Sequence, residues 1–67
     1  MRLTLNGKLR EVTPVATVGE LLEQLGVHRM VVVERNGAIL PRERLAMEPV
    51  QEDDRLEIVH MVGGGQE

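Results

Sequence analysis

Two Asn-Gly dipeptides, Asn6-Gly7 and Asn36-Gly37, constrain the fold of this chain more than any other feature of its sequence. Each stands between two short runs that alternate in polarity or are rich in β-branched residues. Asn-Gly in that setting is the strongest short-range signal for a hairpin, because both central positions of a type I′ turn need positive φ. The sequence therefore predicts two β-hairpins. The expected strands are residues 2–6 and 8–12 in the first hairpin and residues 30–35 and 38–40 in the second.

A single amphipathic helix is expected between the hairpins, at about residues 17–25. Its start has the form of a capping box, in which the Thr17 hydroxyl accepts from the Glu20 amide and the Glu20 side chain accepts from the Thr17 amide. Gly26 fits the left-handed position just past the helix end. Apolar residues at i, i+3, i+4 and i+7 share one face of this helix, which predicts that the face is buried. They are Val18, Leu21, Leu22 and Leu25.

One more helical turn and one more strand complete the expected elements. Residues 42–47 fit a single turn before Pro49, and an acidic turn at residues 52–54, expected to be solvated, leads into a last strand at residues 55–62. This order predicts an α+β fold in which a mixed sheet of four to five strands carries one helix on one face. With the first and last strands side by side in the centre, this is the ubiquitin-like β-grasp arrangement.

The last strand leads directly into the glycine run Gly63-Gly64-Gly65, which Gln66 and Glu67 follow. Glycine loses more backbone freedom on ordering than any other residue, so this run adds no stability and predicts a flexible arm. We therefore expect a folded domain at residues 1–62 and a tail at residues 63–67. An arm without side chains can follow a narrow path into another protein's active site, although glycine tails can also be frayed ends.

Alternation along the last strand predicts which of its side chains are exposed. Leu56 and Ile58 should face the helix, while Val59 and Met61 should lie on the open face of the sheet near the root of the arm. A contiguous apolar patch at that place would mark a docking surface. The residues expected to contact a partner are Val59, Met61, Val62 and Gly63.

Composition excludes several other functions. The chain has 67 residues, no Cys, no aromatic residue and a formal charge of −3. These features argue against a large enzyme, a thiolate metal site, a cysteine nucleophile and a nucleic-acid partner. No metal-ligand spacing surrounds His28 or His60, so no metal site is expected. The chain has no signal peptide and no apolar run of the roughly 20 residues that cross a membrane, so we expect a cytoplasmic protein.

Several short segments, taken in order and with their spacing, resemble the thiamine-pathway sulfur carrier family, ThiS, of the ubiquitin-like β-grasp group. The likeness spans the whole chain and includes the acidic turn and the terminal glycines. The other segments that carry it are Leu5-Asn6-Gly7-Lys8, Val18 to Leu25, Val33-Glu34-Arg35-Asn36-Gly37, Leu40-Pro41-Arg42-Glu43 and Leu56-Glu57-Ile58.

The resemblance implies a protein co-substrate rather than an enzyme. In that family a ubiquitin-activating-like adenylyltransferase uses ATP to adenylate the carboxylate of a C-terminal diglycine. The adenylate is then converted to a thiocarboxylate, with sulfur from a cysteine desulfurase system, and delivers the sulfur to thiazole synthase. By the family register the diglycine is Gly64-Gly65, with Gly65 as the reactive terminus. The resemblance implies no bound cofactor and no catalytic side chain, only the terminal carboxylate.

The chain departs from the family pattern in two places. Asp53 stands where the family's acidic turn usually has Gly, and Asp tolerates the left-handed conformation at a small cost in stability. The second departure is Gln66-Glu67, because Gly65 in an internal amide has no carboxylate oxygen to attack ATP. We therefore expect a processing protease to remove Gln66-Glu67.

Two other functions remain open from the sequence. A carrier of the same fold could supply sulfur to molybdopterin or amino-acid biosynthesis, since the discriminating contacts lie on the partners. A non-carrier interaction module similar to the TGS domain would share the Asn-Gly and acidic-turn features without any use for terminal glycines. The fold alone does not choose among these functions.

Overall fold

The computed structural model describes residues 1–27 and 30–61, and its elements follow the expected order. The strand at residues 38–40 has the expected bounds, the turn expected at residues 42–47 is three residues shorter, and the other segments are one or two residues shorter, as is common at element ends. In chain order they are β1 (Arg2–Leu5), β2 (Lys8–Glu11), α1 (Val18–Gln24), β3 (Val31–Arg35), β4 (Ala38–Leu40), the 3-10 turn η1 (Arg42–Arg44) and β5 (Arg55–His60).

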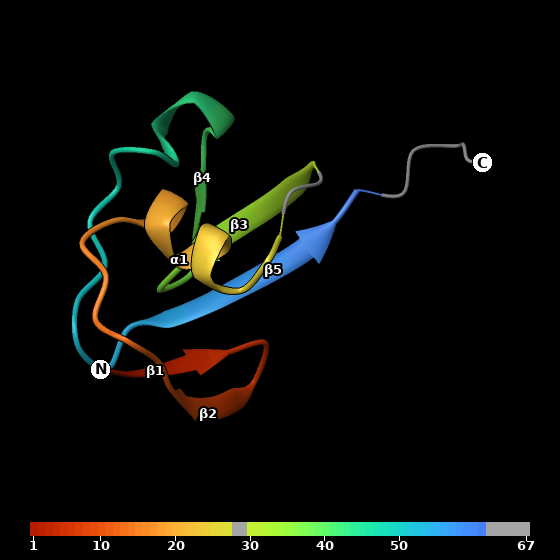
Figure 1. Cartoon of the computed structure of the whole chain (residues 1–67). Helices are drawn as coiled ribbons and strands as arrows, with labels where there is room; N and C mark the ends of the chain where they lie inside the picture. Colours follow the sequence, from red (N-terminus) through yellow and green to blue (C-terminus); the bar gives the residue numbers. More distant parts are fainter. Residues whose placement is uncertain (28–29, 62–67) are drawn as a thin grey trace.

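The five strands form one mixed sheet in the order β2-β1-β5-β3-β4. β1 and β5 pair in parallel at the centre, and every other neighbouring pair is antiparallel. Figure 1 shows α1 lying across one face of this sheet, while the other face is left uncovered. The predicted β-grasp architecture is therefore confirmed, with the strand that leads to the C-terminus in the middle of the sheet.

The core lies between α1 and the sheet. Ten apolar residues are buried there, and the helix contributes three of the four that its periodicity predicted; the fourth, Leu25, is half-buried at the helix end. Burying one such side chain contributes about 1.5–3 kcal/mol, so this cluster is the main source of stability in a domain of this size. The buried core residues are Leu3, Leu5, Val12, Val18, Leu21, Leu22, Val33, Val50, Leu56 and Ile58.

Both hairpins turn on their Asn-Gly dipeptides. Asn6 and Asn36 each have φ of 50°, and the glycines that follow have φ of 82° and 90°. These are the two consecutive positive values that a type I′ turn requires. Asp53 also has positive φ, at 70°, so Asp occupies the left-handed position as expected.

The helix start corrects one detail of the expected capping box. The Thr17 hydroxyl accepts from the Glu20 amide at 3.2 Å, as predicted. The Glu20 carboxylate, however, accepts from the Ala16 amide at 2.8 Å rather than from Thr17. The backbone therefore enters the helix in a direction that brings the Ala16 amide, and not the Thr17 amide, within hydrogen-bond distance of the Glu20 carboxylate. Gly26, with φ of 73°, follows the helix end as expected.

Candidate functional site

The expected reactive terminus, Gly64 and Gly65, lies outside the described residues, as do Val62 and Gly63. The structure therefore describes the part of the site that precedes the arm: β5, the strands beside it and the surface around Met61. None of the described helices is long and apolar enough to span a membrane. Among the described residues, no group of three or more His, Cys, Asp or Glu side chains is arranged to hold a metal ion.

Both Asn-Gly turns hold β5 through the asparagine side chains. Asn6 Oδ1 accepts from the Ile58 amide at 2.6 Å, and Asn6 Nδ2 donates to the Ile58 carbonyl at 3.0 Å. On the other side, Asn36 Oδ1 accepts from the Arg55 amide at 2.9 Å. These asparagines therefore supply two things, a backbone conformation for the turn and hydrogen bonds to the central strand. A type I′ turn alone predicts only the first.

A buried ion pair holds the beginning of β5, and this corrects the expectation that the acidic turn is solvated. Only 6% of Asp54 is exposed, and its Oδ2 accepts from Arg35 Nε at 2.8 Å and from the Gln51 amide at 2.8 Å. Its Oδ1 accepts from Asn36 Nδ2 at 3.1 Å. Glu48 lies on the other side of the guanidinium, with Oε2 3.4 Å from Arg35 Nη1.

The protonation of this pair follows from its contacts. Burial disfavours the charged Asp54 carboxylate, but the hydrogen bonds from Arg35, the Gln51 amide and Asn36 outweigh it, so the pKa of Asp54 lies below its usual value. The hydrogen bond to Asp54 is the main reason that the pKa of Arg35 is raised. The pair is therefore charged at neutral pH. Sequence reasoning missed it because its partners are 19 residues apart and Arg35 alone reads as an ordinary strand residue.

The uncovered face of the sheet carries an apolar patch beside the root of the arm. Val59 is 57% exposed and Met61 54% exposed, as the alternation along β5 predicted. The β3–β5 register places Val32 opposite Val59, and the Met61 amide donates to the Met30 carbonyl at 3.0 Å. Ile39 on β4, 67% exposed, extends the patch toward the edge of the sheet. We call these five residues the open-face patch.

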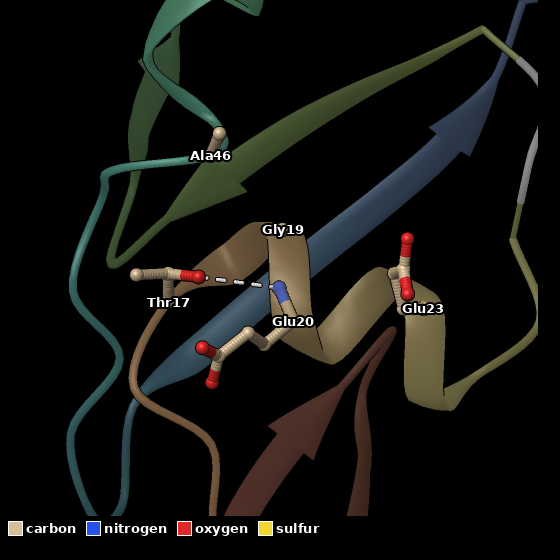
Figure 2. A pocket seen from close by; sticks show the side chains of 5 residues that line it. All are labelled: Thr17, Gly19, Glu20, Glu23 and Ala46. Atoms are coloured by element: carbon tan, nitrogen blue, oxygen red, sulfur yellow. Dashed lines mark hydrogen bonds between the residues drawn. The ribbon is translucent and has the colours of Figure 1, made fainter.

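The hollow beside the start of α1 has no free polar groups that converge on it. Figure 2 shows Thr17, Gly19, Glu20 and Glu23 on the helix side and Ala46 on the segment after η1. The hollow measures about 310 Å³. Its floor is tight, because a Cβ on Gly19 would lie 3.1 Å from the Ala46 Cα. Thr17 and Glu20 use their oxygens to cap the helix, so this hollow belongs to the scaffold.

A second hollow, of about 280 Å³, lies on the helix side of β5. Leu25, Val27 and Ile58 form its apolar wall, and Arg10 and His60 stand at its polar side. Asn6 also lines it, but both ends of that amide are hydrogen-bonded to Ile58. As lined by the described residues, neither hollow brings together a nucleophile and a base.

Comparison with known sequences identifies the family. A sequence model of the ThiS family matches residues 3–65, which is nearly the whole chain and includes the glycine run. The chain belongs to the ThiS family. The expected resemblance is therefore confirmed, because the sequence match and the fold both indicate the ThiS family.

Curated relatives of two kinds are similar to this ThiS-family chain. The sulfur carrier protein ThiS of Bacillus subtilis is 38% identical over 65 residues, which cover 94% of this chain and 98% of that protein. A thiazole synthase of Paramagnetospirillum magneticum is 46% identical over 66 residues, and one of Magnetococcus marinus is 40% identical over 67. The chain spans only about a fifth of the length of these two thiazole synthases, with 20% and 21% covered.

Two solved structures of a thiamine biosynthesis protein from Geobacter metallireducens have the same fold. The crystal structure, of a protein titled ThiS, superposes with a TM-score of 0.82 at 39% identity and covers 97% of this chain and 100% of that one. The solution structure gives a TM-score of 0.80 at 38% identity.

Proposed function

We propose that this chain is a sulfur carrier of thiamine biosynthesis and that its Gly65 carboxylate, once free, holds the sulfur as a thiocarboxylate. The observation that carries the proposal is the family match, which extends through the glycine run to Gly65. The likeness to the Bacillus subtilis sulfur carrier over nearly the full length of both chains supports it. The fold supports it too, because a central strand held by both hairpin turns is a rigid base for a projecting arm.

The chemistry assigns the chain the role of co-substrate. A Gly65 carboxylate oxygen attacks the α-phosphate of ATP, forming the acyl adenylate as the bond to pyrophosphate breaks. A persulfide of the sulfur donor then attacks the acyl carbon and AMP leaves, which gives an acyl disulfide. A thiolate attacks the donor-side sulfur of this disulfide, so that the S–S bond breaks, a new disulfide forms on the donor and the electron pair leaves with the thiocarboxylate. The adenylating enzyme supplies the catalytic groups for the first step, and this chain supplies an unobstructed terminus and a docking surface.

The peptide bond between Gly65 and Gln66 must be hydrolysed before the first step. An amide carbonyl lacks the anionic oxygen that attacks phosphorus, so Gly65 can be adenylated only after this bond has been cut. Cleavage after Gly65 removes Gln66 and Glu67 and leaves the carboxylate at the residue where the family match ends.

Thiazole synthase is the proposed acceptor of the sulfur. Two proteins named thiazole synthase contain a segment similar to nearly all of this chain within about a fifth of their length. Such a carrier-like segment within a thiazole synthase favours the thiazole pathway over molybdopterin or amino-acid biosynthesis as the destination. Val59 and Met61, on the exposed face beside the arm, are the described residues proposed to contact a partner.

Intact mass spectrometry of the protein purified from its native cells, grown without thiamine, tests this proposal. We expect a species that ends at Gly65, a fraction of which is heavier by the replacement of one oxygen with sulfur. Cells supplied with thiamine provide the comparison, because demand for the thiocarboxylate is then low. A chain that still ends at Glu67 in cells actively making thiamine would refute the carrier function and favour the interaction module.

A further inference from the structure

Two glutamates stand opposite each other on the sheet face that α1 does not cover. The β3–β5 register places Glu34 directly opposite Glu57, in the same series of cross-strand pairs as Val32 and Val59. Both glutamates are half-buried. Because side chains alternate along each strand, this pair lies on the face that carries the open-face patch and not on the face under α1.

This arrangement works against the stability of the isolated domain. Like charges directly opposite each other on neighbouring strands destabilise a sheet. Within residues 1–27 and 30–61, neither glutamate has a basic group within 4.0 Å. Arg35, the next residue after Glu34, points to the other face, where it pairs with Asp54 and Glu48. Arg55 lies two residues before Glu57 on the same face of β5, but it forms no ion pair within 4.0 Å with either glutamate, so neither carboxylate has a paired cation among the described residues.

Apolar side chains border the facing carboxylates. Val32 and Val59 form the next cross-strand pair toward the arm, and Ile39 lies opposite Glu34 on β4. A partner that covers this face would remove the glutamates from water together with their apolar neighbours. Burying carboxylates is favourable only when a cation is brought to them, so the chemistry of this surface specifies a basic group on the partner.

We propose that the open-face patch and the Glu34–Glu57 pair together are the docking surface for thiazole synthase, whose surface places an arginine or lysine between the two carboxylates. An arginine suits this position because its planar guanidinium can donate to two carboxylates at once. The patch includes Met61, which is two residues before the first glycine of the arm, so docking there holds the root of the arm against the acceptor. This inference rests on the proposed function, since it takes thiazole synthase as the acceptor.

Neutral variants of the pair give a test in which stability and binding change in opposite directions. Glu57→Gln and Glu34→Gln should each raise Tm, by about 1–8 °C, because they remove the repulsion. The same variants should weaken binding to thiazole synthase about tenfold or more, because the partner's cation loses a buried carboxylate. Exposed carboxylates away from this face, replaced in Glu23→Gln and Glu43→Gln, serve as controls and should leave both quantities unchanged.

Binding is measured by isothermal titration calorimetry, with this chain ending at Gly65 and purified thiazole synthase of the same organism. No thiocarboxylate is needed, so the result is independent of the proposed sulfur chemistry, which the mass measurement tests separately. A higher Tm together with an unchanged Kd for both glutamine variants would overturn the docking proposal. The proposal would also be overturned if the glutamine variants bound thiazole synthase normally but were adenylated poorly, because the open face would then be the docking surface for the adenylating enzyme.

Discussion

Replacing Asp54 with Asn tests whether the buried ion pair anchors the start of β5. The variant keeps the shape of the side chain and removes its charge. The Asn oxygen can still accept from Arg35 and the Gln51 amide, but its NH2 group would then face Asn36 Nδ2, donor against donor. Asn36 cannot reverse its side-chain amide without losing the hydrogen bond that its Oδ1 accepts from the Arg55 backbone amide. The substitution therefore leaves a buried conflict as well as a less compensated Arg35.

The magnitude follows from these losses. Removing one partner of a buried pair costs about 3–5 kcal/mol. Glu48 remains 3.4 Å from Arg35 and compensates part of the charge. We therefore expect Asp54→Asn to lower the unfolding free energy by about 2–4 kcal/mol. The total unfolding free energy of a 67-residue domain is about 3–10 kcal/mol. The substitution should therefore lower Tm by about 10–30 °C.

The pH dependence of the same variant provides a second measurement. The pKa of Asp54 is lower in the folded state than its ordinary value, so the folded state favours the ionised carboxylate. This contribution is fully present above the unfolded-state pKa of about 3.9 and is lost as the pH falls through the lower folded-state pKa. Urea unfolding between pH 7 and pH 2 should therefore show a smaller acid-induced loss of stability in Asp54→Asn than in the unmodified chain.

Asp53→Asn is the matched control, because the neighbouring residue undergoes the same chemical change at an exposed position. Among the described residues, the Asp53 carboxylate forms an ion pair with Arg2 alone, at 3.4 Å, and both side chains are more than half exposed. Asn also tolerates the positive φ of this position. The control should change stability by less than about 0.5 kcal/mol. Equal effects of the two substitutions would refute the assignment of Asp54 as an anchor of β5.

Further substitutions test the core, the hydrogen bonds that hold β5, and the arm. Leu22→Ala should lower the unfolding free energy by about 2–5 kcal/mol in urea titration, and a loss below about 1 would contradict the burial of this helix face. Asn6→Ala should lower the unfolding free energy by about 1–3 kcal/mol. It should also speed hydrogen exchange at the Ile58 amide, which donates to Asn6 Oδ1. Asn6→Gly keeps the positive φ available, so exchange at Ile58 as slow as in the unmodified chain would show that the side-chain bonds are dispensable. Gly65→Ala, in a chain ending at residue 65, should leave Tm unchanged and reduce adenylation by the activating enzyme at least about tenfold. Adenylation at the unmodified rate would contradict the need for a terminal residue without a side chain.

Local patterns were enough to predict the elements and which residues of β5 are exposed. Asn-Gly at 6–7 and 36–37 predicted both hairpins because few other dipeptides tolerate two consecutive positive φ values. Period-two alternation predicted that Val59 and Met61 are exposed and that Leu56 is buried. Such features depend on residues within a few positions of one another, and sequence displays those relations directly.

Contacts between distant residues required the tertiary structure. The Asn6–Ile58 bonds join residues 52 apart, and the Arg35–Asp54 pair joins residues 19 apart. The Glu34–Glu57 pair exists only because β3 and β5 meet in one register, and a shift of β3 by one residue would move Glu34 to the helix side while Glu57 stayed on the other face. Sequence by itself thus determined the elements, their faces and the glycine run. Tertiary packing decided which polar groups support β5 and which glutamates stand opposite each other on the open face, because register and burial are set by the whole core at once.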